Sequence, residues 1–212
     1  RVRGVVFTGS TATARTIARR LAARAEVPLI AETGGQNAMI VDSSALPEQV
    51  VADALISAFN SAGQRCSSLR VLCLQQEIAG DVLKMLSGAM RELRVGDPSC
   101  ISTDVGPLID EQARGRIEMH LKRLRAGIRC RSPLPGECAR GVYIAPALVE
   151  LESIAQLRGE VFGPVLHFLR FERRRLEQLI DAINATGYGL TLGIASRAPG
   201  TIARIIERAQ VG

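Results

Sequence analysis

Short apolar runs rich in β-branched residues alternate along this chain with longer segments of helical periodicity. The short runs predict strands at residues 2–7, 29–32, 38–41, 71–74, 165–171 and 192–195. The longer segments predict helices at residues 11–25, 78–93, 110–126, 176–185 and 201–209, and another that starts at Pro47 and stops at Gly63. Strands and helices that alternate in this way predict an α/β fold with a doubly wound, mostly parallel sheet.

Length and composition place the chain among globular proteins. Its 212 residues suffice for one sizeable domain, or for one domain and part of another. The hydrophobic content is 47%, and the lack of Trp leaves Leu, Ile, Val and Ala to fill the core. No apolar run approaches the length of a membrane span, and no signal peptide precedes the first strand. Because the chain opens on Arg1 instead of Met, we expect a piece of a longer protein.

The formal charge of +6 raises the question of a nucleic-acid partner. The basic residues are scattered, and the densest runs, at residues 122–125 and 173–175, lie on or beside predicted helices with almost no aromatic neighbours. That pattern is typical of solvated helix faces, so we expect no nucleic acid to bind through this segment. Residues 131–140 hold two Pro and one Gly, and they predict a surface loop.

Cysteine usage bears on metals, disulfides and the cellular compartment. The five cysteines are an odd number, none forms a C-x-x-C pair, and the chain has only two histidines. We therefore expect neither a metal site nor a disulfide framework, and we expect a reducing cytoplasm as the location.

The segment F-T-G-S-T at residues 7–11 lies between a predicted strand and a predicted helix. Free amides at a helix N-terminus, together with a glycine that lets the backbone approach a ligand, form an anion site suited to a pyrophosphate. Gly9 and Ser10 are the candidate residues. The alternative is that Ser10 or Thr11 simply caps the helix.

A thiol and a carboxylate suggest covalent catalysis with a separate general base. Cys66 follows a glycine and a cation, and Arg65 would favour its thiolate if the guanidinium points inward. Glu32 ends an apolar strand, where burial would raise its pKa toward that of a useful base. The alternatives are a small buried Cys, as predicted for Cys73 inside its strand, and a strand-end Glu that faces water.

Residues 160–164, E-V-F-G-P, place an acid and an aromatic ring just before a buried strand. Glu160 can accept two hydrogen bonds from a ribose diol, and Phe162 can pack against a flat ring. The alternative is an ordinary turn with a satisfied Glu and a core Phe. Residues 186–191 form a loop with two glycines that leads into the last strand, and this loop could be purely structural.

Five of these segments follow one another along the chain in the order F-T-G-S, E-T-G-G, G-Q-R-C, E-V-F-G-P and G-Y-G-L. In this order, over essentially the whole chain, the sequence resembles the aldehyde dehydrogenase superfamily. The closer resemblance is to glutamate γ-semialdehyde (pyrroline-5-carboxylate) dehydrogenases, and specifically to the C-terminal module of bifunctional bacterial proline-utilisation flavoenzymes. Residues 32–39, 57–67 and 184–191 carry it.

The resemblance implies a role for each candidate at the reacting centre. Cys66 would attack the aldehyde to give a thiohemiacetal, hydride would leave to NAD, and Glu32 would activate the water that hydrolyses the resulting thioester. Ser67 would help to hold the carboxylate of the substrate, and Arg65 adds positive potential beside an anionic substrate.

The resemblance also implies a cofactor and a division into domains. Gly9 and Ser10 would lie near the NAD pyrophosphate, Glu160 would hold a ribose, and Phe162 would pack near the nicotinamide end. FAD would belong only to a proline dehydrogenase domain outside this chain. Residues 1–33 would be the C-terminal tail of the NAD-binding domain, and 34–212 a catalytic domain incomplete at its C-terminus.

The sequence thus predicts a fragment of a larger NAD-dependent enzyme that oxidises L-glutamate γ-semialdehyde to glutamate in proline catabolism. We expect the parent enzyme to be oligomeric and cytoplasmic, or peripheral to the membrane in the full-length bifunctional form. Two alternatives stay open at this point. One is an aldehyde dehydrogenase for another aldehyde, and the other is a non-catalytic module that keeps the fold for assembly.

Overall fold

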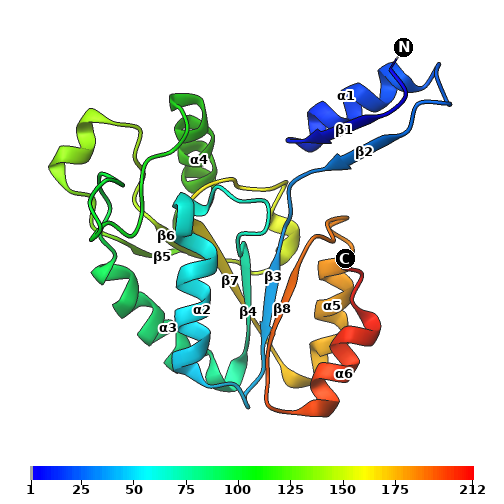
Figure 1. The fold of residues 1–212 in the computed structure, drawn as a ribbon. Coiled ribbons are helices and arrows are strands. Elements are labelled where there is room, and N and C mark those ends of the chain that lie inside the picture. Colours follow the sequence, from blue (N-terminus) through cyan, green and yellow to red (C-terminus); the bar gives the residue numbers. More distant parts are fainter. Residues whose placement is uncertain (1) are drawn as a thin grey trace.

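The computed structural model describes residues 2–212 and contains a six-stranded sheet and a separate two-stranded sheet (Figure 1). The strand order in the large sheet is β5-β6-β7-β4-β3-β8. Its strands are β3 (Ala38–Val41), β4 (Val71–Gln75), β5 (Ile128–Arg131), β6 (Ala147–Glu150), β7 (Val165–Phe171) and β8 (Leu192–Ala195). All neighbouring strands are parallel except β5 and β6, which confirms the prediction of a mostly parallel sheet.

Helices cover both faces of the large sheet, as a doubly wound fold requires (Figure 1). One face packs against α2 (Pro47–Phe59), α3 (Gln76–Glu92) and α4 (Glu111–Arg123). The other face packs against α5 (Leu176–Asn184) and α6 (Pro199–Arg208). Within residues 2–212, no helix is both long and apolar enough to cross a bilayer.

Strand β4 illustrates why these residues form a central strand. Leu72 and Leu74 belong to the core beneath α2 and α3, whereas Val71 and Cys73 belong to the core beneath α5 and α6. Successive side chains of a strand point to opposite faces, so a strand covered on both faces is apolar at nearly every position. All five residues of β4 are buried, and Cys73 is a buried thiol as predicted.

The first unit of the chain lies apart from the large sheet, at the upper right of Figure 1. It consists of β1 (Val5–Thr8), α1 (Thr11–Leu21) and β2 (Leu29–Glu32), with β1 and β2 paired in parallel. Val6 and Ile30 share a face of this pair and are 78% and 59% exposed. The two sheets are joined near residue 33, where the sequence analysis places the domain boundary. The assignment of residues 1–33 to a cofactor domain stays a prediction.

Several predicted boundaries differ from the observed ones. The predicted strand at residues 2–7 begins at Val5, and the predicted helix at 11–25 ends at Leu21. The helix that starts at Pro47 ends at Phe59, before Gly63, because Ser61 and Ala62 adopt left-handed φ angles of 55° and 54°. The sequence analysis did not predict the edge pair β5 and β6, whose strands are only four residues each. Most of the predicted loop at 131–140 is exposed, but Ser132 and Cys138 are buried.

Candidate active site

The candidate residues gather at the amino-terminal edge of the large sheet. Asn37 directly precedes β3, Arg70 directly precedes β4, Pro164 directly precedes β7 and Thr191 directly precedes β8. These four strands are parallel neighbours in the order β7-β4-β3-β8, so the segments before them meet at one edge. Open α/β sheets usually bind ligands at the opposite, carboxyl edge. The candidate site lies instead at the amino edge, where the loops before β3, β4, β7 and β8 form it.

Residues 60–70 form the thiol loop, which carries Cys66. The chain reverses through Ser61, Ala62 and Gly63, all with positive φ. A Cβ atom at Gly63 would overlap the carbonyl group of Gly163, so only glycine fits at this crossing of two loops. After this turn, Arg65, Cys66 and Ser67 are exposed at the tip of the loop.

The thiol at this tip is not the only exposed one. Among residues 2–212, Cys66 and Cys100 are exposed, while Cys73, Cys130 and Cys138 are buried. Burial raises the pKa of Cys73 to about 12, so that thiol is inert at neutral pH. Cys100 lies on a different loop, after α3, and provides an internal comparison for Cys66.

Arg65 does not supply an inward cation to the thiol loop. Its Nε donates a hydrogen bond to the hydroxyl of Ser61 at 3.0 Å, and the side chain is exposed. The condition under which Arg65 would favour the thiolate is therefore not met in this structure. The buried cation of the loop is Arg70.

Arg70 is fully buried and is one of the site residues that the sequence analysis did not predict. Its Nη1 donates to the carbonyl oxygens of Gly63 at 2.7 Å and Gly163 at 3.2 Å. Its Nη2 donates to the carbonyl oxygen of Arg65 at 3.0 Å and to Oε1 of Glu160 at 3.2 Å. A guanidinium that is buried directly before an apolar strand must have hydrogen-bond partners. The position of Arg70 before such a run was therefore the sequence signal for its role.

The charge of Arg70 is coupled to its surroundings. Burial lowers the pKa of the guanidinium, while the negative charges of Glu160 and of a Cys66 thiolate oppose that shift. Arg70 is thus a buried cation whose hydrogen bond to the carbonyl oxygen of Arg65 places it directly behind Cys66 in the loop. The buried cation of the loop therefore lies five positions beyond Arg65 in the sequence.

Asn37 holds the thiol loop from the other side. Its Nδ2 donates to the carbonyl oxygens of Cys66 at 2.6 Å and Ser68 at 2.9 Å. Its Oδ1 accepts from the backbone amide of Thr191 at 3.2 Å. This one buried amide therefore fixes the backbone of Cys66 and ties it to the loop at residues 186–191, whose role was left open.

Glu160 and Phe162 lie against the same guanidinium. Glu160 forms an ion pair with Arg70, and its side chain is 16% exposed. A Cβ atom at Gly34 would overlap the carboxylate of Glu160, so the E-T-G-G segment packs directly on this acid. The ring centroid of Phe162 lies 5.5 Å from Cζ of Arg70, in a cation–π contact. Glu160, Phe162, Gly34 and the thiol loop therefore form one connected cluster.

Ser10 caps α1, as the capping alternative predicted. Its Oγ accepts from the amide of Thr13 at 3.1 Å and lies 2.9 Å from the Thr13 hydroxyl. The amide of Gly9 donates to the carbonyl oxygen of Glu32 at 3.1 Å. Ala14 of α1 is buried and does not line the neighbouring cavity.

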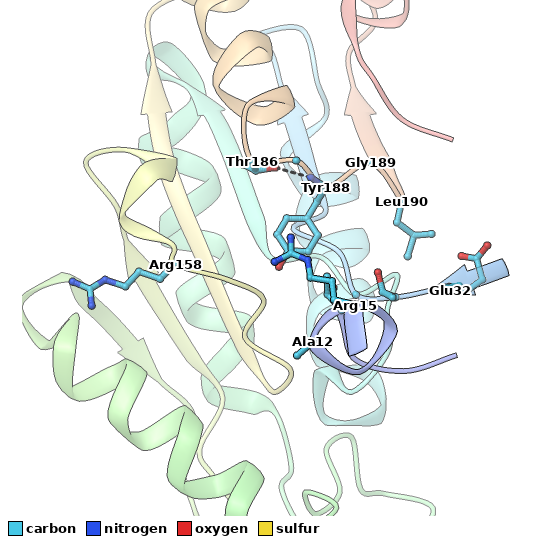
Figure 2. Close-up of a pocket in the computed structure, with 13 residues that line it drawn as sticks. Ala12, Arg15, Glu32, Arg158, Thr186, Tyr188, Gly189 and Leu190 are labelled. Atoms are coloured by element: carbon cyan, nitrogen blue, oxygen red, sulfur yellow. Dashed lines mark hydrogen bonds between the residues drawn. The ribbon is translucent and has the colours of Figure 1, made fainter. Parts of the chain in front are cut away.

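A cavity of about 610 Å³ separates the start of α1 from the loop before β8. In Figure 2, Arg15 rises from α1 and Tyr188 extends from the loop above it toward the same space. The lining residues are Thr11, Ala12, Arg15, Ala31, Glu32, Thr33, Gly34, Arg158, Thr186, Gly187, Tyr188, Gly189 and Leu190. The cavity joins two of the predicted motif segments that lie far apart in the sequence.

Glu32 lies at the rim of this cavity, at the end of β2. Its side chain is exposed and makes no hydrogen bond to Cys66 or to any other part of the chain that the structure describes. This is the solvent-facing alternative considered from the sequence. The structure therefore does not bring the predicted base into contact with the predicted nucleophile.

A second cavity, of about 320 Å³, lies beside Glu160 and Phe162 and is also lined by His120 of α4. Nε2 of His120 is 2.8 Å from Nε2 of His167, which is fully buried in β7. Within residues 2–212, no group of three or more His, Cys, Asp or Glu side chains could hold a metal ion. These histidines are instead part of a hydrogen-bonded chain.

The model of the aldehyde dehydrogenase family matches residues 1–212 of the sequence. The chain belongs to the aldehyde dehydrogenase family. The bifunctional protein PutA of Escherichia coli (strain K12) is 54% identical over all of this chain, which spans 17% of that protein. The chain thus spans about a sixth of the length of this curated relative.

Two further members of the family bear on cofactor and substrate. The 1-pyrroline-5-carboxylate dehydrogenase of Geobacillus kaustophilus is 30% identical over 87% of this chain and 36% of its own length. The betaine aldehyde dehydrogenase of Staphylococcus aureus, solved in complex with NAD+, superposes with a TM-score of 0.92. It is 26% identical over 99% of this chain and 42% of that one. These likenesses confirm the fold and the family predicted from the sequence.

Proposed function

We propose that this chain is the thiol-bearing part of an NAD-dependent dehydrogenase that oxidises L-glutamate γ-semialdehyde to glutamate in proline catabolism. Membership of the aldehyde dehydrogenase family supports an oxidoreductase, and the relatives named for PutA and for 1-pyrroline-5-carboxylate support the substrate. The observation that carries the proposal is the exposed thiol of Cys66. It stands at the tip of a loop that the buried side chains of Arg70 and Asn37 hold from both sides.

In the proposed reaction, the thiolate of Cys66 attacks the aldehyde carbon and forms a carbon–sulfur bond, which gives a thiohemiacetal. Bound NAD would supply the hydride acceptor for this carbon. Loss of the hydride, together with the hydroxyl proton as the carbonyl bond reforms, would leave a thioester on Cys66. Glu32 then takes a proton from water, the hydroxide oxygen attacks the thioester carbon, and the thiolate of Cys66 leaves. The product carries the new carboxylate, and the thiol is ready for another cycle.

Glu32 must reach the thioester for this second step. Because its carboxylate is exposed at a strand end and unengaged by other described residues, a change of side-chain rotamer breaks no hydrogen bond there. Catalytic contacts of this kind are often long in structures without substrate and tighten in the complex. We therefore retain Glu32 as the proposed base.

The residues present fit an NAD molecule in three places. The first-turn amides of α1, with Gly9 and Ser10 before them, and the guanidinium of Arg15 at the 610 Å³ cavity suit a pyrophosphate. Glu160 has one carboxylate oxygen outside its ion pair with Arg70, and this oxygen can accept a ribose hydroxyl. Phe162 is 44% exposed and offers an aromatic edge near the nicotinamide end.

The substrate proposal rests on the surroundings of Cys66. Ser67 adds an exposed hydroxyl next to the nucleophile, and Arg65 adds an exposed cation on the same loop tip. A short aldehyde that carries a carboxylate can use both groups, whereas a neutral aldehyde cannot. An aldehyde dehydrogenase for another acyl group is the alternative.

The remaining assignments follow from the same proposal. Residues 1–33 are assigned to the tail of the NAD-binding domain and 34–212 to the catalytic domain. The parent enzyme is expected to be oligomeric and cytoplasmic, with FAD only in a separate proline dehydrogenase domain. A non-catalytic assembly module is the competing function, and it would have no use for an exposed, anchored thiol.

The deciding experiment uses the full-length protein that contains this chain. NADH formation is measured with glutamate γ-semialdehyde for the unchanged protein, for Cys66→Ala and for the matched control Cys100→Ala. We expect the unchanged protein and Cys100→Ala to form NADH and Cys66→Ala to form none above background. Turnover that survives in Cys66→Ala refutes the assignment of the nucleophile. Lack of turnover in all three proteins, with propanal as well, favours the assembly module.

A further inference from the structure

Arg70 joins two loops that are far apart in the sequence. Three of its four acceptors are main-chain carbonyl oxygens, from Gly63 and Arg65 on the thiol loop and from Gly163 on the loop before β7. The planar guanidinium presents its donors in a fixed fork, so it sets both the distance and the orientation between its partners. A lysine ammonium cannot reproduce this arrangement.

The fourth acceptor of Arg70 is the carboxylate of Glu160, so Arg70 contacts both the thiol loop and this acid. Glu160 accepts from Nη2 through Oε1, and the same nitrogen donates to the carbonyl oxygen of Arg65, the residue before Cys66. The carboxylate therefore offsets part of the positive charge of the guanidinium that holds the backbone next to Cys66.

The backbone of Arg70 is itself held by a chain of hydrogen bonds from the 320 Å³ cavity. Nη2 of Arg123 lies 3.2 Å from Nδ1 of His120, whose Nε2 lies 2.8 Å from Nε2 of His167. Nδ1 of His167 lies 2.9 Å from the carbonyl oxygen of Arg70. A carbonyl oxygen can only accept and a guanidinium can only donate. With both imidazoles neutral, every donor in the chain then points from Arg123 toward Arg70.

We infer that Arg70 is a positioning residue that sets the geometry of the Cys66 loop and couples the thiol to the charge of Glu160. This inference rests on the proposed function, in which Cys66 is the nucleophile and Glu160 contacts the cofactor. The other cation near the thiol is Arg65, which faces Ser61, and the neighbouring imidazoles of His120 and His167 are neutral. Arg70 touches no reacting atom in this arrangement.

The coupling predicts opposite effects from the two ends of the ion pair. Arg70→Met removes the cation, so the Cys66 thiolate becomes less favourable and its alkylation slows. Glu160→Gln removes the neutralising charge but keeps the guanidinium and its carbonyl acceptors, so the thiolate becomes more favourable and alkylation quickens. If Arg70 and Glu160 had only structural roles, the two substitutions would not change the rate of Cys66 alkylation in opposite directions.

The test is peptide mapping of iodoacetamide labelling in the full-length protein between pH 6 and 10. Cys100 is the internal reference for an exposed thiol, and Cys73, Cys130 and Cys138 report unfolding if they become labelled. We expect Arg70→Met to lower the Cys66-to-Cys100 rate ratio about tenfold, because the attraction between a unit positive charge and the thiolate is lost. Glu160→Gln should raise the ratio and move the pH midpoint of Cys66 labelling downward. Arg70→Lys should recover part of the ratio.

Ratios within twofold of the unchanged protein in both variants overturn the inference. If labelling shows that the buried thiols are exposed in both Arg70 variants, Glu160→Gln alone tests the inference. An unchanged pH midpoint of Cys66 labelling in Glu160→Gln then overturns the inference. Labelling needs neither aldehyde nor NAD. A protein that forms no NADH therefore defeats the proposed function and not the coupling, while normal turnover with unmoved midpoints defeats only the coupling.

Discussion

Nδ2 of Asn37 lies 2.6 Å from the carbonyl oxygen of Cys66, so the backbone of the proposed nucleophile is held by a buried amide from a neighbouring strand end. The same group reaches the carbonyl oxygen of Ser68, and its Oδ1 accepts from Thr191. One side chain thereby joins three loops at the amino edge of the sheet. Its removal should affect both stability and the position of the thiol.

Asn37→Ala should lower the free energy of unfolding by about 2–4 kcal/mol, because three hydrogen bonds are lost and their partners stay partly buried. Turnover with the semialdehyde should fall through kcat more than through KM, since the thiol and not the binding surface is displaced. Urea unfolding and steady-state kinetics of the full-length protein measure the two effects. Gln178→Ala, at an exposed position on α5, is the matched control. A stable variant with unchanged kcat would contradict this account of Asn37.

The two histidines predict a specific dependence of stability on pH. Burial, aided by the neighbouring cation of Arg123, lowers the pKa of His120 to about 4. Burial, aided by the charges of His120 and Arg70, lowers the pKa of His167 to about 3. Both values lie below the unfolded value of 6.5. As the pH falls below 6.5, the unfolded chain takes up protons that the folded chain does not.

The two histidines should therefore make their full contribution to the free energy of unfolding above about pH 6.5. This contribution should decline as the pH falls toward 4. Each histidine can contribute a slope of up to about 1.4 kcal/mol per pH unit. Because the chain has only two histidines, His120→Gln should make the decline shallower. The measurement is the urea midpoint between pH 7 and pH 5, above the range in which most carboxylates titrate. A flat profile in the unchanged protein would show that the pair is not held neutral.

Gly34→Ala should weaken cofactor binding selectively. A Cβ atom at this position overlaps the carboxylate of Glu160, so the acid must leave its place beside Arg70. We expect KM for NAD to rise about tenfold, with a smaller change in KM for the aldehyde, because one charge-assisted hydrogen bond is lost. Gly80→Ala is the control, since a Cβ atom there meets no neighbour within 4 Å and the position lies inside α3. Equal changes in both variants would point to a general effect on the fold.

The sequence predicted the central strands well because their signal is local. Residues 165–171 were predicted as a strand and form β7 with the same bounds, since a nearly unbroken apolar run of this length is typical of a parallel strand covered on both faces. Strand β5, I-R-C-R, alternates apolar and charged residues at the sheet edge and has a register shift against β6. A short, irregular edge strand gives no comparable pattern.

The site was predictable in part for a similar reason. Cys66 and Glu160 stand in recognisable segments, but the partner that connects them does not. Arg70 contacts Gly163 across 93 positions of the chain, and His120 contacts His167 across 47. Such pairs depend on strand order, which local patterns do not specify. The left-handed backbone at Ser61 and Ala62 is likewise imposed by the crossing of loops and not by residue preference.

Glu32→Gln should block hydrolysis of the thioester more than its formation. A carboxylate can take a proton from water and an amide cannot, and general-base catalysis is worth roughly a hundredfold to ten-thousandfold. We expect a burst of NADH followed by a slow steady state in rapid-mixing experiments on the full-length protein. Glu26→Gln, an exposed acid near the start of the same strand, is the control. Loss of the burst with normal alkylation of Cys66 would place Glu32 in an earlier step.

Ser67→Ala tests the specificity of the proposed reaction. The hydroxyl is exposed beside Cys66, and a hydrogen bond to a charged group contributes about 1.5–3 kcal/mol. KM for glutamate γ-semialdehyde should therefore rise about tenfold to a hundredfold, while KM for propanal, which has no carboxylate, should stay nearly unchanged. Ser102→Ala, at an exposed position on another loop, should change neither value. If both constants rise together in Ser67→Ala, or if the unchanged protein prefers propanal, the semialdehyde is not the substrate, although the chain remains an aldehyde dehydrogenase.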